Sequence, residues 1–166
     1  LAEAYFYQGM LQRLRGAHDK ACESFSHTIE LDPGHSSAYY FRGLTHELLG
    51  NTDQALEDYS AAIERDPDHT PAYAMRGSIY VSLERYEEAL SDLNRAILLR
   101  PADAISHLLR GKTYHALCRE QEALKDYIQA IRLDERLAEA YRGRGIIYSS
   151  LGNFSAAIDD LNQAIR

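Results

Sequence analysis

Residues 36–69 read SSAYYFRGLTHELLGNTDQALEDYSAAIERDPDH, and this stretch holds the pattern of the whole chain. In its first half, Tyr39, Gly43 and His46 follow the spacing of one helix face, and Gly50 can end that helix in left-handed backbone geometry. A second run places small and apolar residues on one face, at Ala55, Tyr59, Ala62 and Ile63. The stretch therefore predicts two antiparallel helices joined by a short turn, which we call helix A and helix B.

The stretch recurs along the chain with a step of 34 residues. Helix A keeps a glycine, at Gly9, Gly43, Gly77, Gly111 and Gly145, and helix B keeps an alanine, at Ala21, Ala55, Ala89, Ala123 and Ala157. A fixed period of this length predicts a solenoid, because each unit must stack on its neighbours to bury its apolar face. We expect one domain of about five units, at residues 2–35, 36–69, 70–103, 104–137 and 138–166, with the last unit incomplete in a fragment of a longer protein.

Prolines mark the end of helix B in three units, at Pro33, Pro67 and Pro101. A proline disfavours helix for the residue before it, so the chain should turn there into the next helix A. Glu135 holds this place in the fourth unit, and we expect that turn to be less sharply specified.

The composition excludes some classes of function. The net charge of -7 argues against nucleic acid as a partner, because such binding rests on lysines and arginines that neutralise phosphates. The apolar runs are far too short to cross a bilayer. Cys22 and Cys118 have no reason to meet, so we expect reduced thiols, and with no export signal visible the cytoplasm is the favoured location.

The repeat resembles the tetratricopeptide repeat family, whose unit carries an aromatic, a glycine, a tyrosine, an alanine, an aromatic, a second alanine and a proline in that order. Its aromatic places read Tyr5, Tyr39, Tyr73, His107 and Tyr141 on helix A and Phe25, Tyr59, Leu93, Tyr127 and Leu161 on helix B. The first unit departs most, with Gln12, Arg15 and Thr28. The resemblance covers the whole chain. It implies an all-α, right-handed superhelical α-solenoid whose helix A faces line a concave groove that binds a protein or peptide.

Two charged columns run through four of the five units. Arginine precedes the glycine of helix A at Arg42, Arg76, Arg110 and Arg144, and aspartate lies on helix B at Asp58, Asp92, Asp126 and Asp160. The first unit has neither, but Gln8 and Ser24. Because presence and absence go together, we expect structural ion pairs between the two columns. An arginine ladder that binds an acidic ligand is the alternative.

The helix A residues that face away from helix B are the expected groove. They are Phe6, Met10, Tyr40, Phe41, Leu44, Met75, Leu108, Lys112 and Arg142. An exposed apolar surface of this size usually marks an interaction site. Phe41, Met75 and Leu109 can equally complete the packing between units. Lys112 and Arg142 would meet acidic groups of a bound peptide.

No pattern of catalytic residues is visible. His115 and Cys118 are three residues apart, but structural zinc needs four ligands and no second pair is near. Phosphate-binding glycine loops and nucleophile motifs are also missing. We expect no enzymatic activity, no metal and no cofactor.

Two functions remain open. One is an adaptor that binds a partner peptide in the groove. The other is a self-assembly or scaffold module that packs through its ends or its convex face, since Ile158, Leu161 and Ile165 form a helix B face that a further helix A would cover. A homo-oligomer through this C-terminal end would follow from the second.

Overall fold

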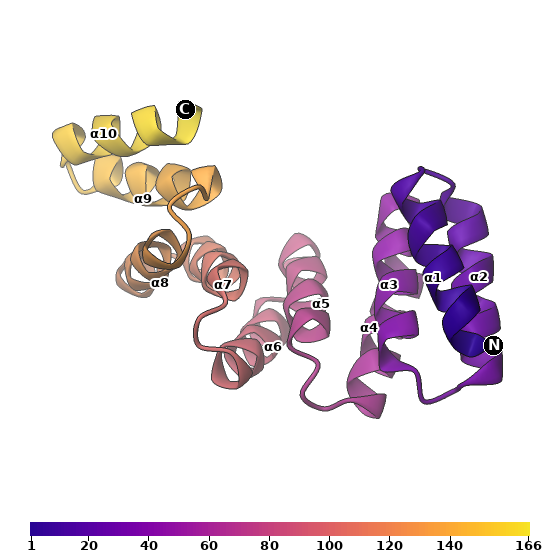
Figure 1. The fold of residues 1–166 in the computed structure, drawn as a ribbon. Helices are drawn as coiled ribbons and strands as arrows, with labels where there is room; N and C mark the ends of the chain where they lie inside the picture. The colour runs from indigo at the N-terminus through magenta and orange to yellow at the C-terminus, as the bar shows by residue number, and fades with distance from the viewer. The chain divides into compact units, whose positions relative to one another are not determined.

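The computed structural model describes residues 1–166 as ten α-helices without a strand. They are α1 (Ala2–Leu14), α2 (His18–Leu31), α3 (Ser36–Leu48), α4 (Thr52–Arg65), α5 (Thr70–Ser82), α6 (Tyr86–Leu99), α7 (Ala104–Ala116), α8 (Glu120–Leu133), α9 (Ala138–Ser150) and α10 (Phe154–Ile165). Odd-numbered helices are helix A and even-numbered helices are helix B. Antiparallel pairs form between α1 and α2, α3 and α4, α7 and α8, and α9 and α10 (Figure 1). The predicted all-α fold of helix pairs is confirmed.

The chain forms two compact units. The N-terminal unit, Leu1–Ile79, contains α1 to α4 and most of α5, and the C-terminal unit, Tyr80–Arg166, contains α6 to α10. Inside the N-terminal unit α2 also packs on α3, and inside the C-terminal unit α6 packs on α7 and α8 on α9. Each unit therefore shows one pair stacking on the next. That the whole chain is one domain stays a prediction.

The turns between helix A and helix B have a left-handed residue at the same place in every repeat. Gly16, Gly50 and Gly152 have φ angles of 74°, 77° and 77°. Glu84 and Cys118 hold this place in the other two repeats, with φ angles of 58° and 57°. Glycine adopts this conformation without the steric cost that a side chain adds. The turn geometry is therefore set by the repeat, even where glycine is missing.

Helix B ends at the same place with and without a proline. Helix α8 has 14 residues, like α2, α4 and α6, although Glu135 stands where the others have proline. An aspartate at the end of the helix accounts for this, because the Asp134 side chain accepts a hydrogen bond from the backbone N–H of Arg136 at 2.9 Å. Asp32 and Asp66 make the same turn, because they accept hydrogen bonds from the backbone N–H of Gly34 and Asp68, each at 3.1 Å. The fourth turn thus ends its helix at the same place, and that it is less sharply specified stays a prediction.

The repeated glycines allow helix A and helix B to approach closely. A Cβ atom on Gly43 would lie 2.8 Å from the Tyr59 ring, and one on Gly9 would lie 2.7 Å from the Phe25 ring. Both distances are shorter than real side-chain contacts, so any larger residue would push the aromatic ring away. The aromatic residues of helix B thus lie directly on the backbone of helix A.

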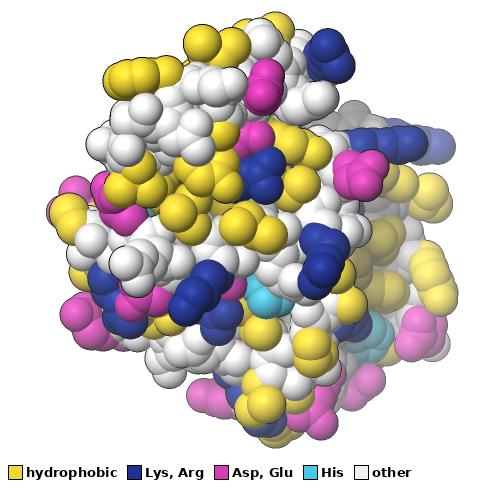
Figure 2. All heavy atoms as spheres, turned by 90° about the vertical axis from the view of Figure 1, so that its left-hand side faces the viewer, with side chains coloured by type: hydrophobic (Ala, Val, Ile, Leu, Met, Phe, Trp, Pro, Cys, Tyr) yellow, Lys and Arg dark blue, Asp and Glu magenta, His cyan; other side chains and the backbone are white.

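Hydrophobic side chains gather on the surface of the C-terminal unit. In Figure 2 they lie in the upper half of the view, where Figure 1 has α9 and α10. The exposed hydrophobic residues of α10 are Phe154, Ile158, Leu161 and Ile165. This helix packs against α9 on one side, and its other side carries an apolar face.

Candidate binding surfaces

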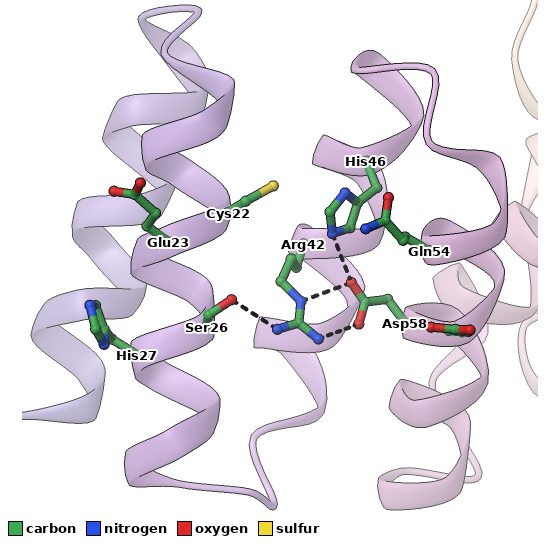
Figure 3. A pocket seen from close by; sticks show the side chains of 9 residues that line it. Cys22, Glu23, Ser26, His27, Arg42, His46, Gln54 and Asp58 are labelled. Atoms are coloured by element: carbon green, nitrogen blue, oxygen red, sulfur yellow. Dashed lines mark hydrogen bonds and ion pairs between the residues drawn. The ribbon is translucent and has the colours of Figure 1, made fainter.

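An arginine of α3 links three helices of the N-terminal unit (Figure 3). Arg42 donates hydrogen bonds from Nε and Nη2 to the carboxylate of Asp58 on α4, at 2.9 and 2.7 Å. Its Nη1 donates to the hydroxyl of Ser26 on α2, at 2.9 Å. A two-fold contact between guanidinium and carboxylate fixes the orientation of both groups. Arg42 therefore holds helix A against its own helix B and the preceding one.

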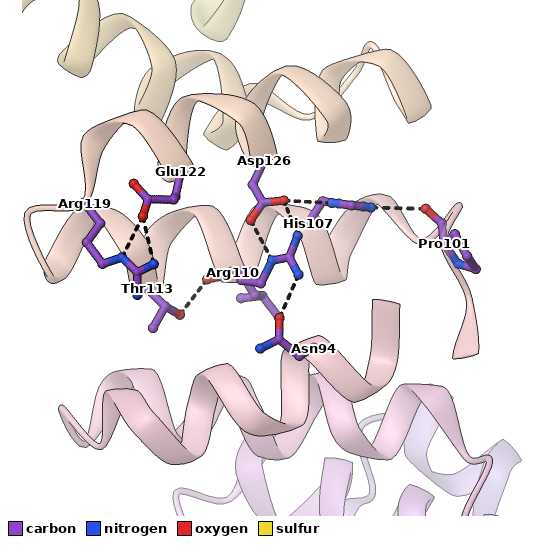
Figure 4. Close-up of polar contacts among 9 residues, drawn as sticks. Asn94, Pro101, His107, Arg110, Thr113, Arg119, Glu122 and Asp126 are labelled. Carbon is purple, nitrogen blue, oxygen red and sulfur yellow. Dashed lines mark hydrogen bonds and ion pairs between the residues drawn. The ribbon is translucent and has the colours of Figure 1, made fainter. Parts of the chain in front are cut away.

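The same arrangement in the C-terminal unit includes a histidine (Figure 4). Arg110 donates to Asp126 at 2.7 and 2.8 Å and to Asn94 of α6 at 2.7 Å. His107 Nδ1 lies 2.9 Å from the Asp126 carboxylate, and its Nε2 lies 3.1 Å from the Pro101 carbonyl oxygen. Burial alone would raise the pKa of Asp126, but the hydrogen bonds from Arg110 and His107 outweigh it and lower the pKa. The carboxylate is therefore ionised at neutral pH.

Three of the four predicted ion pairs are present. The third joins Arg144 to Asp160, at 2.8 and 2.7 Å. Arg76 and Asp92 lie in different units, and their pairing stays a prediction. The alternative of an anion-binding ladder gains no support from the three arginines, because each already holds a buried carboxylate.

The first repeat replaces the ion pair by a neutral contact. Ser24 has the place of the aspartate, and its hydroxyl donates to the side-chain oxygen of Gln12 at 2.8 Å. Gln8, in the place of the arginine, is exposed. Helix A and helix B are joined in this repeat without a buried charge.

The predicted groove residues of the N-terminal unit are all half-buried: Phe6, Met10, Tyr40, Phe41, Leu44 and Met75. Phe41 stacks on Phe25 with ring centroids 6.2 Å apart and lies 5.7 Å from Phe6. The Tyr40 ring lies 5.9 Å from Tyr59 and 4.9 Å from His69. These aromatic residues therefore pack between repeats with part of their surface and present the rest on the helix A side.

Leu108 does not belong to a surface. It is 5% exposed and packs in the core of the C-terminal unit with Tyr127 and Ile131. Leu137, which precedes α9, packs against the same cluster. Neighbouring residues thus cover the Leu108 side chain, and the prediction that it lines the groove was wrong.

The helix A side of the C-terminal unit has a hollow of about 190 Å³. It is lined by Lys112, His115, Ala116, Tyr127, Glu139, Arg142, Gly143 and Ile146. A Cβ atom on Gly143 would lie 2.5 Å from the Tyr127 ring, so the glycine lets this ring pack directly on the backbone of α9. Burial raises the pKa of Tyr127 to about 12, so its hydroxyl keeps its proton at neutral pH. The hollow therefore combines an aromatic floor with a charged rim.

The rim holds cations with different degrees of pairing. Lys112 forms an ion pair with Glu139, and its hydrogen bond lowers the pKa of that carboxyl group. Arg142 is exposed and has no ion-pair partner in the structure. The Nδ1 atom of His115 is buried and has no hydrogen-bond partner. Among these groups, the exposed Arg142 can offer a cation to an acidic group.

A second hollow, of about 510 Å³, lies on the helix B side of the N-terminal unit (Figure 3). Cys22, Ser26, Arg42, His46 and Asp58 are among its lining residues. Burial raises the pKa of the Cys22 thiol to about 11, so the reactive thiolate is rare at neutral pH. Our sequence reasoning missed this hollow. The signal was present, because Cys22 stands where other repeats have leucine or isoleucine, and His46 stands where three of them have tyrosine.

The structure was also searched for metal-ligand clusters and for membrane-spanning helices. Three or more potential ligands among histidine, cysteine, aspartate and glutamate do not converge anywhere in the structure. None of the ten helices combines the length and the apolar character needed to span a bilayer.

Family models match the sequence one after another. Models described as tetratricopeptide repeat match residues 3–35, 36–69 and 119–166, and a model described as TPR repeat matches residues 77–117. Together they leave only short gaps. No curated protein matches the chain.

Solved structures with the same fold include TTC0263, MamA and YrrB. TTC0263, a thermophilic TPR protein in Thermus thermophilus, is 26% identical, with a TM-score of 0.79 over 99% of this chain and 90% of that one. MamA from Desulfovibrio magneticus is 18% identical, with a TM-score of 0.85 over 99% and 93%. YrrB, a TPR protein with an unusual peptide-binding site, is 24% identical, with a TM-score of 0.78 over 99% and 85%. The likeness shows a helical solenoid fold.

Proposed function

The chain belongs to the tetratricopeptide repeat family, and from this premise we propose that it is a non-catalytic interaction module that binds a peptide segment of a partner protein on its helix A surfaces. The observation that carries the proposal is the hollow between α7 and α9, which is lined by Tyr127 and has Lys112 and Arg142 at its rim. Such a combination of an apolar floor and few polar groups is typical of ligand sites. YrrB, with its peptide-binding site, gives a precedent within the same fold.

The two units suit different kinds of peptide residue. On the N-terminal unit, the exposed parts of Tyr40, Leu44 and Met10 offer aromatic and flexible apolar area, which accommodates apolar side chains. On the C-terminal unit, Arg142 has no partner of its own and suits an acidic side chain. We therefore expect the N-terminal unit to favour apolar peptide residues and the C-terminal unit to favour aspartate or glutamate.

Selection of peptides from a displayed random library would test the proposal. The affinity of selected peptides would be measured by fluorescence anisotropy for the wild type and for Arg142→Glu. We expect Arg142→Glu to weaken binding at least tenfold, since it reverses the only unpaired charge of the rim. The matched control is Arg132→Glu, an exposed arginine on α8, which should change the affinity less than twofold.

The N-terminal surface is tested with the same peptides. The double variant Tyr40→Ser, Leu44→Ser should weaken binding, whereas Leu48→Ser, an exposed position on the same helix, should not. Circular dichroism would show that all variants keep their helix content. Groove binding would be overturned if the peptides bound every variant equally. It would also be overturned if the selection enriched no common peptide sequence.

A further inference from the structure

The hollow on the helix B side of the N-terminal unit is bordered by two residues that are smaller than their counterparts in other repeats. Cys22 stands where the other repeats have leucine or isoleucine, and His46 stands where three of them have tyrosine. In the C-terminal unit, the ring of Tyr114 lies 5.8 Å from the guanidinium carbon of Arg110, beside an ion pair of the same kind. Both replacements leave more open space at the junction of α2, α3 and α4, where the hollow of about 510 Å³ lies.

The floor of the hollow is electrically balanced. Arg42 is bonded to Asp58 and to Ser26, so its charge is matched by that of the aspartate (Figure 3). His46 lies beside them, with its Nε2 atom 3.9 Å from the Asp58 carboxylate. Burial lowers the pKa of His46 more than this carboxylate raises it, so the ring is neutral at pH 7. The floor therefore carries no net charge.

The rim of the hollow is acidic. Glu23 on α2 and Glu57 on α4 line the hollow and are exposed, and neither forms an ion pair within the chain. His27, which also lines it, lies 3.1 Å from Glu30. Because the charges of the floor match each other, the carboxylates of Glu23 and Glu57 are left without a cation. A positively charged group is therefore attracted to the hollow, and a negatively charged group is repelled.

An organic cation suits this hollow better than a metal ion does. Three or more potential metal ligands do not converge there, and burial raises the pKa of the Cys22 thiol to about 11, so the metal-binding thiolate is rare. Lysine and arginine carry their charge on a long apolar stem and need no such convergence of ligands. The volume of the hollow also falls within the range of about 300–1,000 Å³ that is typical of ligand sites.

We propose that this hollow is a second binding site of the chain, which receives a lysine or arginine side chain of a partner protein. The cationic head would approach the carboxylates of Glu23 and Glu57, and the apolar stem would pass Cys22. The side-chain amide of Gln54 adds a further hydrogen-bond acceptor. The site shares no residue with the helix A surfaces, so its test is independent of the peptide binding proposed above.

NMR titration of the isotope-labelled chain with the peptides Ac-Gly-Arg-Gly-NH2 and Ac-Gly-Lys-Gly-NH2 would test this proposal. At low ionic strength we expect saturable shifts of the backbone amides of α2 and α4 around the hollow, and no such shifts with Ac-Gly-Glu-Gly-NH2. Glu57→Gln should weaken the binding about fivefold, the size expected for one partly exposed charge pair. The matched control Asp53→Asn removes the same charge from an exposed residue of α4 outside the hollow, and it should change the affinity less than about twofold.

Filling the hollow would test its space without a change of net charge. The double variant Cys22→Leu, His46→Tyr introduces residues that other repeats have and should abolish the shifts, whereas Cys22→Ser keeps the space and should bind like the wild type. Circular dichroism would show that both variants keep their helix content. The proposal fails if neither basic peptide shifts the amides around the hollow, or if the filled variant binds as well as the wild type. Equal effects of Glu57→Gln and Asp53→Asn would also contradict it, because they indicate attraction to the acidic surface in general.

Discussion

The pairs α1–α2 and α7–α8 fill the same place between helix A and helix B with different polar contacts. In α7–α8, Arg110 donates two hydrogen bonds to the buried carboxylate of Asp126, at 2.7 and 2.8 Å. In α1–α2, the hydroxyl of Ser24 donates one bond to Gln12 at 2.8 Å, and no buried charge is present. Both pairs keep the close contact between a helix A glycine and a helix B aromatic ring.

This comparison separates the contact that both helix pairs share, between glycine and an aromatic ring, from the ion pair that only α7–α8 has. The glycine and aromatic contact occurs in both, so it suffices to define how the two helices meet. The ion pair adds orientation, but a buried charge is favourable only while its partner is present. Removal of one ion-pair partner in α7–α8 should therefore lower the free energy of unfolding much more than removal of the neutral bond in α1–α2.

The largest effect is expected for Asp126→Ala. It leaves Arg110 and His107 without their common acceptor, and breaking one side of a buried ion pair costs about 3–5 kcal/mol. The free energy of unfolding would be measured by urea denaturation, followed by circular dichroism. The control Gln121→Ala changes an exposed residue of the same helix and should have little effect. A loss below about 1 kcal/mol, the size of an exposed pair, would contradict a buried structural pair.

Part of that effect should depend on pH. The pKa of Asp126 is lowered in the folded chain, so its contribution is complete above the unfolded value of about 3.9 and is lost as the pH falls through the folded pKa. The difference in unfolding free energy between wild type and Asp126→Ala should thus shrink as the pH falls below about 4. Other carboxyl groups titrate in both proteins and largely cancel in the difference. A difference that does not change with pH would show that the charge of Asp126 contributes nothing.

A smaller loss of unfolding free energy is expected when the contact that both pairs share is disturbed, and it should be similar in the two pairs. A Cβ atom would lie 2.7 Å from Phe25 in Gly9→Ala and 3.0 Å from Tyr127 in Gly111→Ala. Overpacking costs about 1–3 kcal/mol, and the higher helix propensity of alanine offsets about 1 kcal/mol. Both variants should therefore lose up to about 2 kcal/mol in the same denaturation experiment. A loss in only one of them would show that the two pairs do not rest on the same contact.

The sequence predicted these pairs well because steric fit restricts the residue types. Only glycine leaves room for a ring such as Tyr59, and this requirement repeats every 34 residues. The arginine and aspartate columns could be matched because both are missing from the first repeat. By contrast, the contact of His107 with Asp126 was not predicted, since a histidine in an aromatic column fits simple packing equally well.

The candidate surface was harder to predict than the fold. Leu108 was expected in the groove, because helical periodicity gives the direction of a side chain but not whether the next repeat covers it. The hollow beside Tyr127 is lined by residues of α7, α8 and α9, and the periodicity of a single helix does not show how much space three packed helices leave between them. The charges of Lys112 and Arg142 were found, because cations are rare on an otherwise apolar surface.

The smallest effect is expected for Ser24→Ala in the first repeat. The substitution removes the donor to Gln12, but the half-buried amide of Gln12 can turn to water, so only about 0.5–1.5 kcal/mol should be lost. The buried hydroxyl of Thr28 donates to the backbone oxygen of Ser24 at 3.0 Å, and this bond remains in the variant. Hydrogen exchange of the α1–α2 amides, together with urea denaturation, would measure the local and global loss. If Ser24→Ala lowered the free energy of unfolding as much as Asp126→Ala, the neutral bond would be as necessary as the ion pair. The contact between glycine and the aromatic ring would then not suffice to join the helices.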